Sequence, residues 1–460
     1  MNDKKTNRHS LPYNRYFKAP VLAGTLLMLL GAASCSSPDT SGADATEVLK
    51  WPGGRSAAIS ITYDDGNINQ FQKAMPIMDS LGIPGTFFII TGNIPGSENQ
   101  GKFIGRDVQE IIAETAAVPT NDSNFFERAS AIGFSGYKGA VEYHTRAGGR
   151  YEAGKIAEAH QIIDEGYAKI RNGELAKGEQ PKAEVAEAAG TTWDDIRAYA
   201  AAGHEFASHT VTHPYLSVLD ETNLLYELEN SKADIEAQLG APHTFSAEGP
   251  YGTEDPRVVE HINKIYDLTR NKMTDEYLID LNRSDRSSIA SHAAKEYVRW
   301  QRGVMSNTPL ADTKAWVDTA IAAGNTWLVL VYHGVDGIGW EAVKSEEMKS
   351  YFGYMKEKEN DVWVATFGNV GKYIRERMNA QVTTTITGNT ASVSLSHQLD
   401  TAAYNLPLTL KTYLPSDWTS VQVQQGDSTQ TVATQQDEKG TYVQYDAYPN
   451  TTAVQLTNQQ

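Results

Sequence analysis

Short apolar runs alternate with helix-like segments over most of this chain, and this alternation is the feature that most constrains its fold. The runs AAISITY (57–63), GTFFIIT (85–91), WLVLVYH (327–333) and VWVATF (362–367) are apolar on both faces, as in strands covered by helices. Between the first two runs, residues 70–81 have a helical pattern that ends at Gly82. Strand, helix and strand at this spacing make a βαβ unit, so the pattern predicts a parallel α/β sheet.

Two other parts of the chain depart from this alternation. Residues 99–190 form an insertion that begins with Gly and aromatic residues and continues with an Ala-, Glu- and Lys-rich helical composition. From residue 380 the chain alternates apolar with polar residues, which predicts a small all-β, sandwich-like domain over 380–460. We expect this domain to be either a glycan-binding module or a structural cap.

The N-terminus has the pattern of an export signal. Basic residues precede the apolar stretch VLAGTLLMLLGAAS, which is short for a membrane span and leads to Cys35, the only cysteine. We predict a lipoprotein-type signal peptide over 1–35 with lipidation of Cys35, followed by a polar tether over 36–50. The protein is then exported and lipid-anchored to the bacterial cell envelope, at the outer membrane or cell surface. Cleavage by an ordinary signal peptidase, giving a periplasmic or secreted protein, is the alternative.

The charge of the chain restricts its partners. A formal net charge of -17 argues against nucleic acid as a partner. We expect contact with a membrane only through the N-terminal lipid anchor.

Polar residues able to do chemistry follow several of the predicted strands. Asp64 and Asp65 come directly after the first strand, His209 and His213 follow a short strand in HEFASHTVTH, and His333 ends the 327–333 strand. The carboxyl ends of parallel strands converge on one face of a barrel or open sheet, so these side chains are expected to meet there.

This set of residues suits metal-assisted hydrolysis. Two imidazoles four positions apart, together with one carboxylate, suit Zn²⁺ or a similar divalent ion and leave one coordination position open for water. The second carboxylate of the Asp64–Asp65 pair can then act as a base, and a histidine from another strand can protonate the leaving group. The cation also makes two adjacent negative charges tolerable.

At these residues the chain resembles the polysaccharide deacetylase family, the NodB-homology carbohydrate esterases of family 4. TYDDG (62–66), SHTVTH (208–213), GPYG (249–252) and LVLVYHGV (328–335) are similar to its first, second, third and fifth motifs. The resemblance covers roughly residues 50–375 and implies a catalytic domain over 51–378 with a distorted (β/α)7-type barrel. It implies metal-dependent hydrolysis of N-acetyl or O-acetyl groups on a polysaccharide or oligosaccharide by metal-activated water, with the acetylated glycan as partner.

The resemblance also assigns roles by position. It implies Asp65, His209 and His213 as metal ligands, Asp64 as catalytic base, His333 as acid, the backbone amide of Tyr251 as an oxyanion donor and Leu330 as lining of the acetyl pocket. It implies Zn²⁺ as the metal, with Co²⁺ or Ni²⁺ as alternatives.

The third motif departs from the family pattern at one position. The family has an Arg that steadies the base where this chain has Glu248, and a Glu near Asp64 is expected to raise the pKa of that carboxyl. We predict that Arg302 supplies the missing cation. Trp300, near a fourth motif that is not clear, is predicted to contact substrate.

Two further segments are candidates for substrate contact. The insertion is expected either to form a wall of the substrate cleft, with Tyr137, Tyr143, Arg146 and Tyr151 as sugar contacts, or to be a solvated helical excursion. Trp340 is expected to contact a sugar or to cover the core. The loss of the family Arg also leaves a second function open, a carbohydrate-binding protein on a catalytically impaired scaffold.

Overall fold

A computed structural model describes residues 45–178, 191–273 and 297–459 of the chain. The predicted signal peptide, the lipidation site Cys35 and most of the predicted tether lie outside these ranges. Among the helices within them, none is long and apolar enough to cross a membrane.

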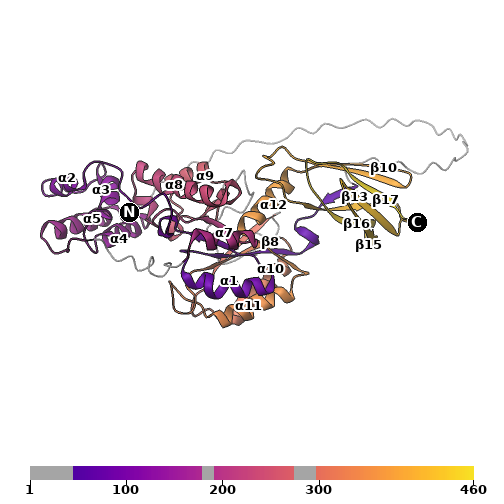
Figure 1. The fold of residues 1–460 in the computed structure, drawn as a ribbon, viewed down its shortest axis with the longest axis horizontal. Helices are drawn as coiled ribbons and strands as arrows, with labels where there is room; N and C mark the ends of the chain where they lie inside the picture. The colour runs from indigo at the N-terminus through magenta and orange to yellow at the C-terminus, as the bar shows by residue number, and fades with distance from the viewer. Residues whose placement is uncertain (1–44, 179–190, 274–296, 460) are drawn as a thin grey trace, which may run out of the picture. The chain divides into compact units, whose positions relative to one another are not determined.

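A parallel sheet forms the centre of the part of the chain that precedes the C-terminal domain (Figure 1). Its strands, in spatial order, are β6 (Leu268–Thr269), β5 (Ser246–Ala247), β4 (Glu205–Ser208), β3 (Thr86–Ile89), β2 (Ala57–Tyr63), β8 (Thr326–Tyr332) and β7 (Val298–Gly303). A further strand, β9 (Val362–Val364), pairs with the first half of β2, whereas β3 pairs with its end. The predicted fold class, a distorted (β/α) barrel followed by an all-β domain, is confirmed.

Helices follow the strands as the alternation predicts. They are α1 (Met75–Leu81), α7 (Trp193–Ala201), α8 (Glu221–Leu239), α9 (Pro256–Ile265), α10 (Leu310–Ala323), α11 (Ser345–Glu357) and α12 (Phe367–Asn379). Local sequence sets their ends: Gly82 closes α1 with a left-handed φ of 64°, and Thr192 begins α7 with a capping box to Asp195.

Side chains alternate between the two faces of the sheet. In β2, Ile59 and Ile61 pack in a core with residues of α1, α7, α8, α10 and α11, whereas Ala58 packs in a second core with residues of α12. Because the period of a strand is two residues, Thr62 and Asp64 continue the face of Ala58, toward the interior of the barrel.

The insertion is a helical lobe with its own core (Figure 1). Its helices up to residue 178, where the described part of the insertion ends, are α2 (Val108–Glu114), α3 (Phe125–Ile132), α4 (Val141–Glu152) and α5 (Ile156–Arg171). Tyr143 is buried in this core, Tyr151 stacks on Phe125 and Arg146 pairs with Glu165. These side chains therefore stabilise the lobe, and the prediction that Tyr143 contacts a sugar is wrong.

The C-terminal part is a β-sandwich. One sheet contains β12 (Leu408–Tyr413), β16 (Gly440–Ala447) and β15 (Gln435–Asp437), and the other contains β10 (Gln381–Thr387), β11 (Thr390–Ser396), β17 (Val454–Asn458), β13 (Ser420–Gln425) and β14 (Ser428–Ala433). Leu410 and Val443 of the first sheet share one core with Val393 and Leu456 of the second. This confirms the predicted sandwich-like domain.

The predicted tether is shorter than 36–50. Residues Thr46–Val48 form strand β1, which pairs antiparallel with β12 of the sandwich. Thr46 is buried, and its hydroxyl lies 2.8 Å from that of Thr412. The segment before the barrel is thus part of the C-terminal domain, because Thr46–Val48 form the edge strand of its first sheet.

A buried carboxyl group lies where α12 meets the sandwich. Glu376 of α12 has no exposed side-chain surface, accepts a hydrogen bond from the Leu406 amide at 3.0 Å and lies 3.6 Å from the Nε2 atom of His397. Burial raises the pKa of Glu376 to about 7, although the Leu406 N–H and the Lys372 charge act in the opposite direction.

We predict that Glu376→Gln stabilises the protein at alkaline pH. The folded pKa lies above the usual value of 4.5, so the free energy of unfolding falls as pH rises from about 4.5 to about 7. Gln keeps the acceptor for Leu406 without a charge, and the variant should gain about 1–3 kcal/mol at pH 8. Urea unfolding at pH 8 and pH 4.5 checks this, and an equal effect at both pH values would contradict it.

Candidate active site

Ionisable side chains stand directly after five parallel strands and meet at one end of the sheet. They are Asp64 and Asp65 after β2, His209 after β4, Glu248 after β5, Arg270 after β6 and His333 after β8. The predicted convergence of Asp64, Asp65, His209, His213 and His333 therefore occurs.

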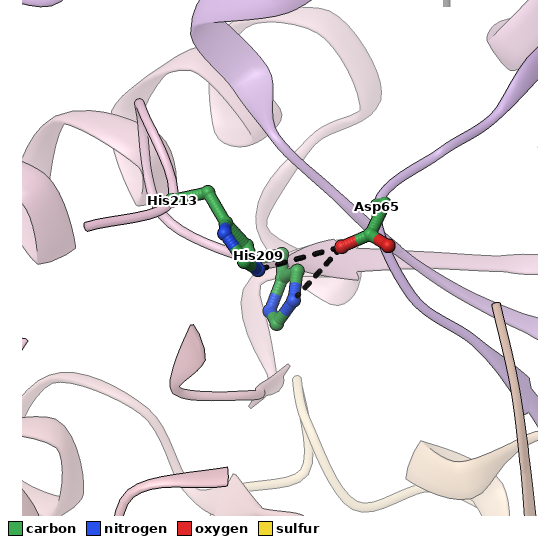
Figure 2. Close-up of side chains that lie close together, drawn as sticks. All are labelled: Asp65, His209 and His213. Atoms are coloured by element: carbon green, nitrogen blue, oxygen red, sulfur yellow. Dashed lines mark ion pairs between the residues drawn. The ribbon is translucent and has the colours of Figure 1, made fainter. Parts of the chain in front are cut away.

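Asp65, His209 and His213 form a compact group (Figure 2). The Oδ1 atom of Asp65 lies 3.7 Å from Nε2 of His209 and 3.4 Å from Nε2 of His213. One donor atom from each residue lies within 4.8 Å of the other two, as three ligands of one metal ion require.

The protonation of the two imidazoles fits a metal site. Nδ1 of His209 lies 2.9 Å from the carbonyl oxygen of Glu248, and a carbonyl only accepts, so Nδ1 carries the proton and Nε2 keeps its lone pair. Burial lowers the pKa of His209 to about 4 and holds the pKa of His213 well below its usual value. Two neutral imidazoles and one carboxylate suit a divalent ion such as Zn²⁺.

The backbone around this group is strained. Asp65, Thr210, His213 and Tyr251 have φ values of 73°, 69°, 61° and 60°, in the left-handed region that disfavours side chains. Each such residue costs on the order of 1 kcal/mol or more. Strain concentrated at one place in the fold is typical of a functional site, where side-chain direction matters more than local stability.

Glu227 holds the loop between the two histidines. Its buried carboxylate accepts hydrogen bonds from the Val211 amide at 2.9 Å and from the Thr212 amide at 2.8 Å. It also accepts one from the Thr212 hydroxyl at 2.6 Å. No motif marks this residue in the sequence, since it comes from the middle of α8.

We predict that Glu227→Leu weakens metal binding about 10- to 100-fold, because it leaves two loop amides without an acceptor. Glu227→Gln retains an acceptor oxygen and should bind metal within a few-fold of the wild type. Calorimetric titration of metal-free protein with Zn²⁺ checks both variants. Equal affinity in the wild type and in Glu227→Leu would show that the carboxylate does not position the ligands.

Asp64 has different partners from its neighbour Asp65. Arg270 donates to both of its carboxylate oxygens, from Nη1 to Oδ1 at 2.7 Å and from Nη2 to Oδ2 at 2.6 Å. Nε2 of His333 lies 3.3 Å from Oδ2. Burial acts to raise the pKa of Asp64, but Arg270 and His333 outweigh it, and the pKa lies well below its usual value. Asp64 is therefore ionised near neutral pH, as a base must be.

The prediction that Arg302 supplies the missing cation is wrong. Arg270, not Arg302, pairs with Asp64. The guanidinium of Arg302 lies over Trp300, 4.4 Å from the ring centroid, and 5.9 Å from that of Trp316. Sequence reasoning missed Arg270, although it follows strand β6 as the other site residues follow theirs.

Glu248 pairs with the same arginine. Its Oε1 atom lies 3.2 Å from Nη2 of Arg270. Burial, and to a smaller degree the charge of Asp64, raise the pKa of Glu248 to about 7. The expected rise of the Asp64 pKa is thus wrong, because Arg270 bridges the two carboxyl groups and the rise falls on Glu248.

The predicted substrate-binding residues divide into buried and exposed ones. Leu330 is fully buried and packs in the same core as its register partner Ile61, on the face of the sheet opposite to Thr62 and Asp64, so the prediction that Leu330 lines the acetyl pocket is wrong. Trp300 is 4% exposed, so the prediction that Trp300 contacts substrate is also wrong. Trp340 is 57% exposed, with its ring centroid 4.7 Å from that of His333. Tyr251 is 45% exposed, and its ring lies 4.8 Å from that of His213.

The polysaccharide deacetylase family model matches residues 182–266. This segment includes His209, His213, Glu248 and Tyr251. The resemblance to the polysaccharide deacetylases of carbohydrate esterase family 4, inferred from the motifs, is thereby confirmed. No protein with a curated description matches the chain.

The solved structures that are similar to this chain include the following three. A protein from Mycobacterium smegmatis assigned as a polysaccharide deacetylase is 14% identical, with a TM-score of 0.38 over 74% of this chain and 96% of its own. A family 4 carbohydrate esterase from Bacillus anthracis is 11% identical, with a TM-score of 0.32 over 71% and 86%. The peptidoglycan deacetylase PdaC from Bacillus subtilis is 10% identical, with a TM-score of 0.31 over 70% and 92%.

Proposed function

We propose that this protein is a metal-dependent deacetylase that hydrolyses N-acetyl or O-acetyl groups of a polysaccharide or oligosaccharide. The observation that carries the proposal is that the adjacent carboxylates Asp64 and Asp65 contact different partners. Asp65 faces two neutral imidazoles, whereas Asp64 faces a cation and His333. Adjacent residues are thus equipped for two roles, ligand and base.

Asp65, His209 and His213 would hold the metal, with Zn²⁺ the best fit and Co²⁺ or Ni²⁺ as alternatives. When bound, a divalent metal supplies Lewis acidity that polarises the acetyl carbonyl and lowers the pKa of water at the site. Neutral imidazoles are the form that binds metal, and burial keeps both histidines in it.

The remaining residues would move protons and stabilise charge. Asp64, kept ionised by Arg270, accepts a proton from the attacking water. His333, beside Asp64, donates a proton to the leaving amine or alcohol. The Tyr251 amide is proposed to donate to the oxyanion of the tetrahedral intermediate.

Acetate release from acetylated xylan and from chitooligosaccharides tests this proposal. Purified protein is assayed with added Zn²⁺ and with a chelator, and unacetylated xylan is the blank. We expect release from at least one substrate, lost with the chelator and restored by metal; the active substrate decides between ester and amide. No release from either substrate by metal-loaded protein would overturn the proposal in favour of a carbohydrate-binding protein on an impaired scaffold.

The location of the protein is also a proposal. The basic N-terminus, apolar stretch and single Cys35 support export and lipid anchoring to the bacterial cell envelope. Cys35→Ser should move the protein from the membrane fraction to the soluble fraction of the cells. An unchanged membrane fraction would contradict lipidation at this residue.

A further inference from the structure

Two tyrosines stack face to face beside the metal-binding group. The rings of Tyr215 and Tyr251 are 3.8 Å apart at their centroids, with an angle of 5° between their planes. Tyr251 is 45% exposed, and its ring lies 4.8 Å from that of the proposed ligand His213. An aromatic pair with an exposed member thus adjoins the proposed metal site.

Helix α4 of the insertion contacts Tyr215 and holds it in position. The Tyr215 amide donates to Nε2 of His144 on α4 at 3.0 Å, and Nδ1 of His144 lies 2.8 Å from the Ala129 carbonyl. A carbonyl only accepts, so Nδ1 carries the proton and Nε2 is the acceptor. Burial lowers the pKa of His144, which favours this neutral form.

Close packing of α4 against the Tyr215 ring also holds this tyrosine in position. A Cβ atom at Gly148 of α4 would lie 2.3 Å from the Tyr215 ring, so only glycine allows the helix to approach this tyrosine. Within the described part of the insertion, α4 therefore contacts the site through Tyr215, a residue outside the insertion.

A second exposed aromatic side chain lies beside the other catalytic group. Trp340 is 57% exposed, with its ring 4.7 Å from that of His333. The tyrosine pair adjoins a proposed metal ligand, and Trp340 adjoins the proposed acid. Flat, amphipathic rings of this kind give binding area at low entropic cost, and their faces suit the C–H faces of pyranose rings.

We propose that the Tyr215–Tyr251 pair, held by α4 of the insertion, is a subsite for a pyranose next to the acetylated residue. The substrate class is then a glycan chain of at least two pyranose units and not an isolated acetylated sugar. This inference rests on the proposed deacetylase function and names its substrate more closely.

The test compares long and small substrates. We measure kcat and KM of metal-loaded protein for acetylated xylooligosaccharides and chitooligosaccharides of two to six units, and for 4-methylumbelliferyl acetate. Tyr215→Leu should lower kcat/KM for the oligosaccharides roughly tenfold or more, chiefly through KM, which corresponds to about 1.4 kcal/mol. Its kcat/KM for the small ester should stay within two-fold of the wild type. Tyr354→Leu, at a partly buried tyrosine of α11 that packs against the core between the sheet and its outer helices, is the matched control and should change neither.

A binding measurement separates this inference from the proposed function. Calorimetric titration with unacetylated xylohexaose and chitohexaose needs no turnover, and Tyr215→Leu should weaken the binding of the oligosaccharide that the wild type binds. His144→Phe should weaken oligosaccharide binding less than Tyr215→Leu does. It removes the acceptor for the Tyr215 amide but leaves the aromatic ring of Tyr215 in place. An equal loss on the ester and on the oligosaccharides, or no loss on either, would overturn the subsite. Absence of acetate release with binding still dependent on Tyr215 would overturn the proposed function alone.

Discussion

Asp64→Asn is expected to lower the rate of acetate release by 10²- to 10⁴-fold while the protein keeps its affinity for metal within a few-fold. Asp64 contacts Arg270 and His333, whereas Asp65 alone of the pair contacts His209 and His213. An amide at position 64 cannot accept the proton of water, but it leaves the three proposed ligands in place.

Asp65→Asn is the matched comparison, one residue away. It should lose both metal affinity and acetate release, because it removes a ligand. Acetate release and Zn²⁺ titration on both variants separate the two roles. Loss of metal binding in Asp64→Asn, or turnover near the wild-type rate, would contradict the assignment of Asp64 as base.

Arg270→Met is expected to lower turnover by about a hundred-fold or more and to destabilise the fold by about 3–5 kcal/mol. It leaves Asp64 and Glu248 buried together without their shared cation. The pKa of Asp64 then rises, so the acid limb of the pH–rate profile should move to higher pH. Arg302→Met, beside Trp300 and Trp316, is the control and should keep turnover within a few-fold.

A charge swap keeps this prediction testable if the single variant does not fold. Glu248→Arg combined with Arg270→Met places the cation at the position of the family motif and should recover part of the turnover lost in Arg270→Met. No recovery in a folded double variant, or full turnover in Arg270→Met, would show that the cation does not support Asp64.

The site residues that could be predicted from the sequence are those that directly follow a recognisable strand. Asp64, His209 and His333 each follow a buried run that reads clearly as a strand, and parallel strands bring their carboxyl ends together. Arg270 follows β6, which has only two residues, so its run YDLTR gave a weak signal. Arg302 is close in sequence to the aromatic residue Trp300, which suggested a place in the site, but it stands within β7 and its guanidinium lies over Trp300.

Contacts between distant elements were not predictable from local pattern. Glu227 supports the histidine loop from the middle of α8, and His144 supports Tyr215 from the insertion. Nothing in the spacing of these residues marks their partners, which are fixed only when the elements pack. Strand β1 was missed for the same reason, since its partner β12 lies more than 350 residues further on.

The most direct test of the account is acetate release measured against the amount of Zn²⁺ bound per chain. Metal-free protein is titrated with Zn²⁺, and bound metal and acetate release are determined on the same samples, with His213→Ala in parallel. We predict that activity rises in proportion to metal and reaches its maximum at one ion per chain, and that His213→Ala loses both. Acetate release by metal-free protein, or by His213→Ala at the wild-type rate, would contradict the assignment of Asp65, His209 and His213 as the metal site of a deacetylase.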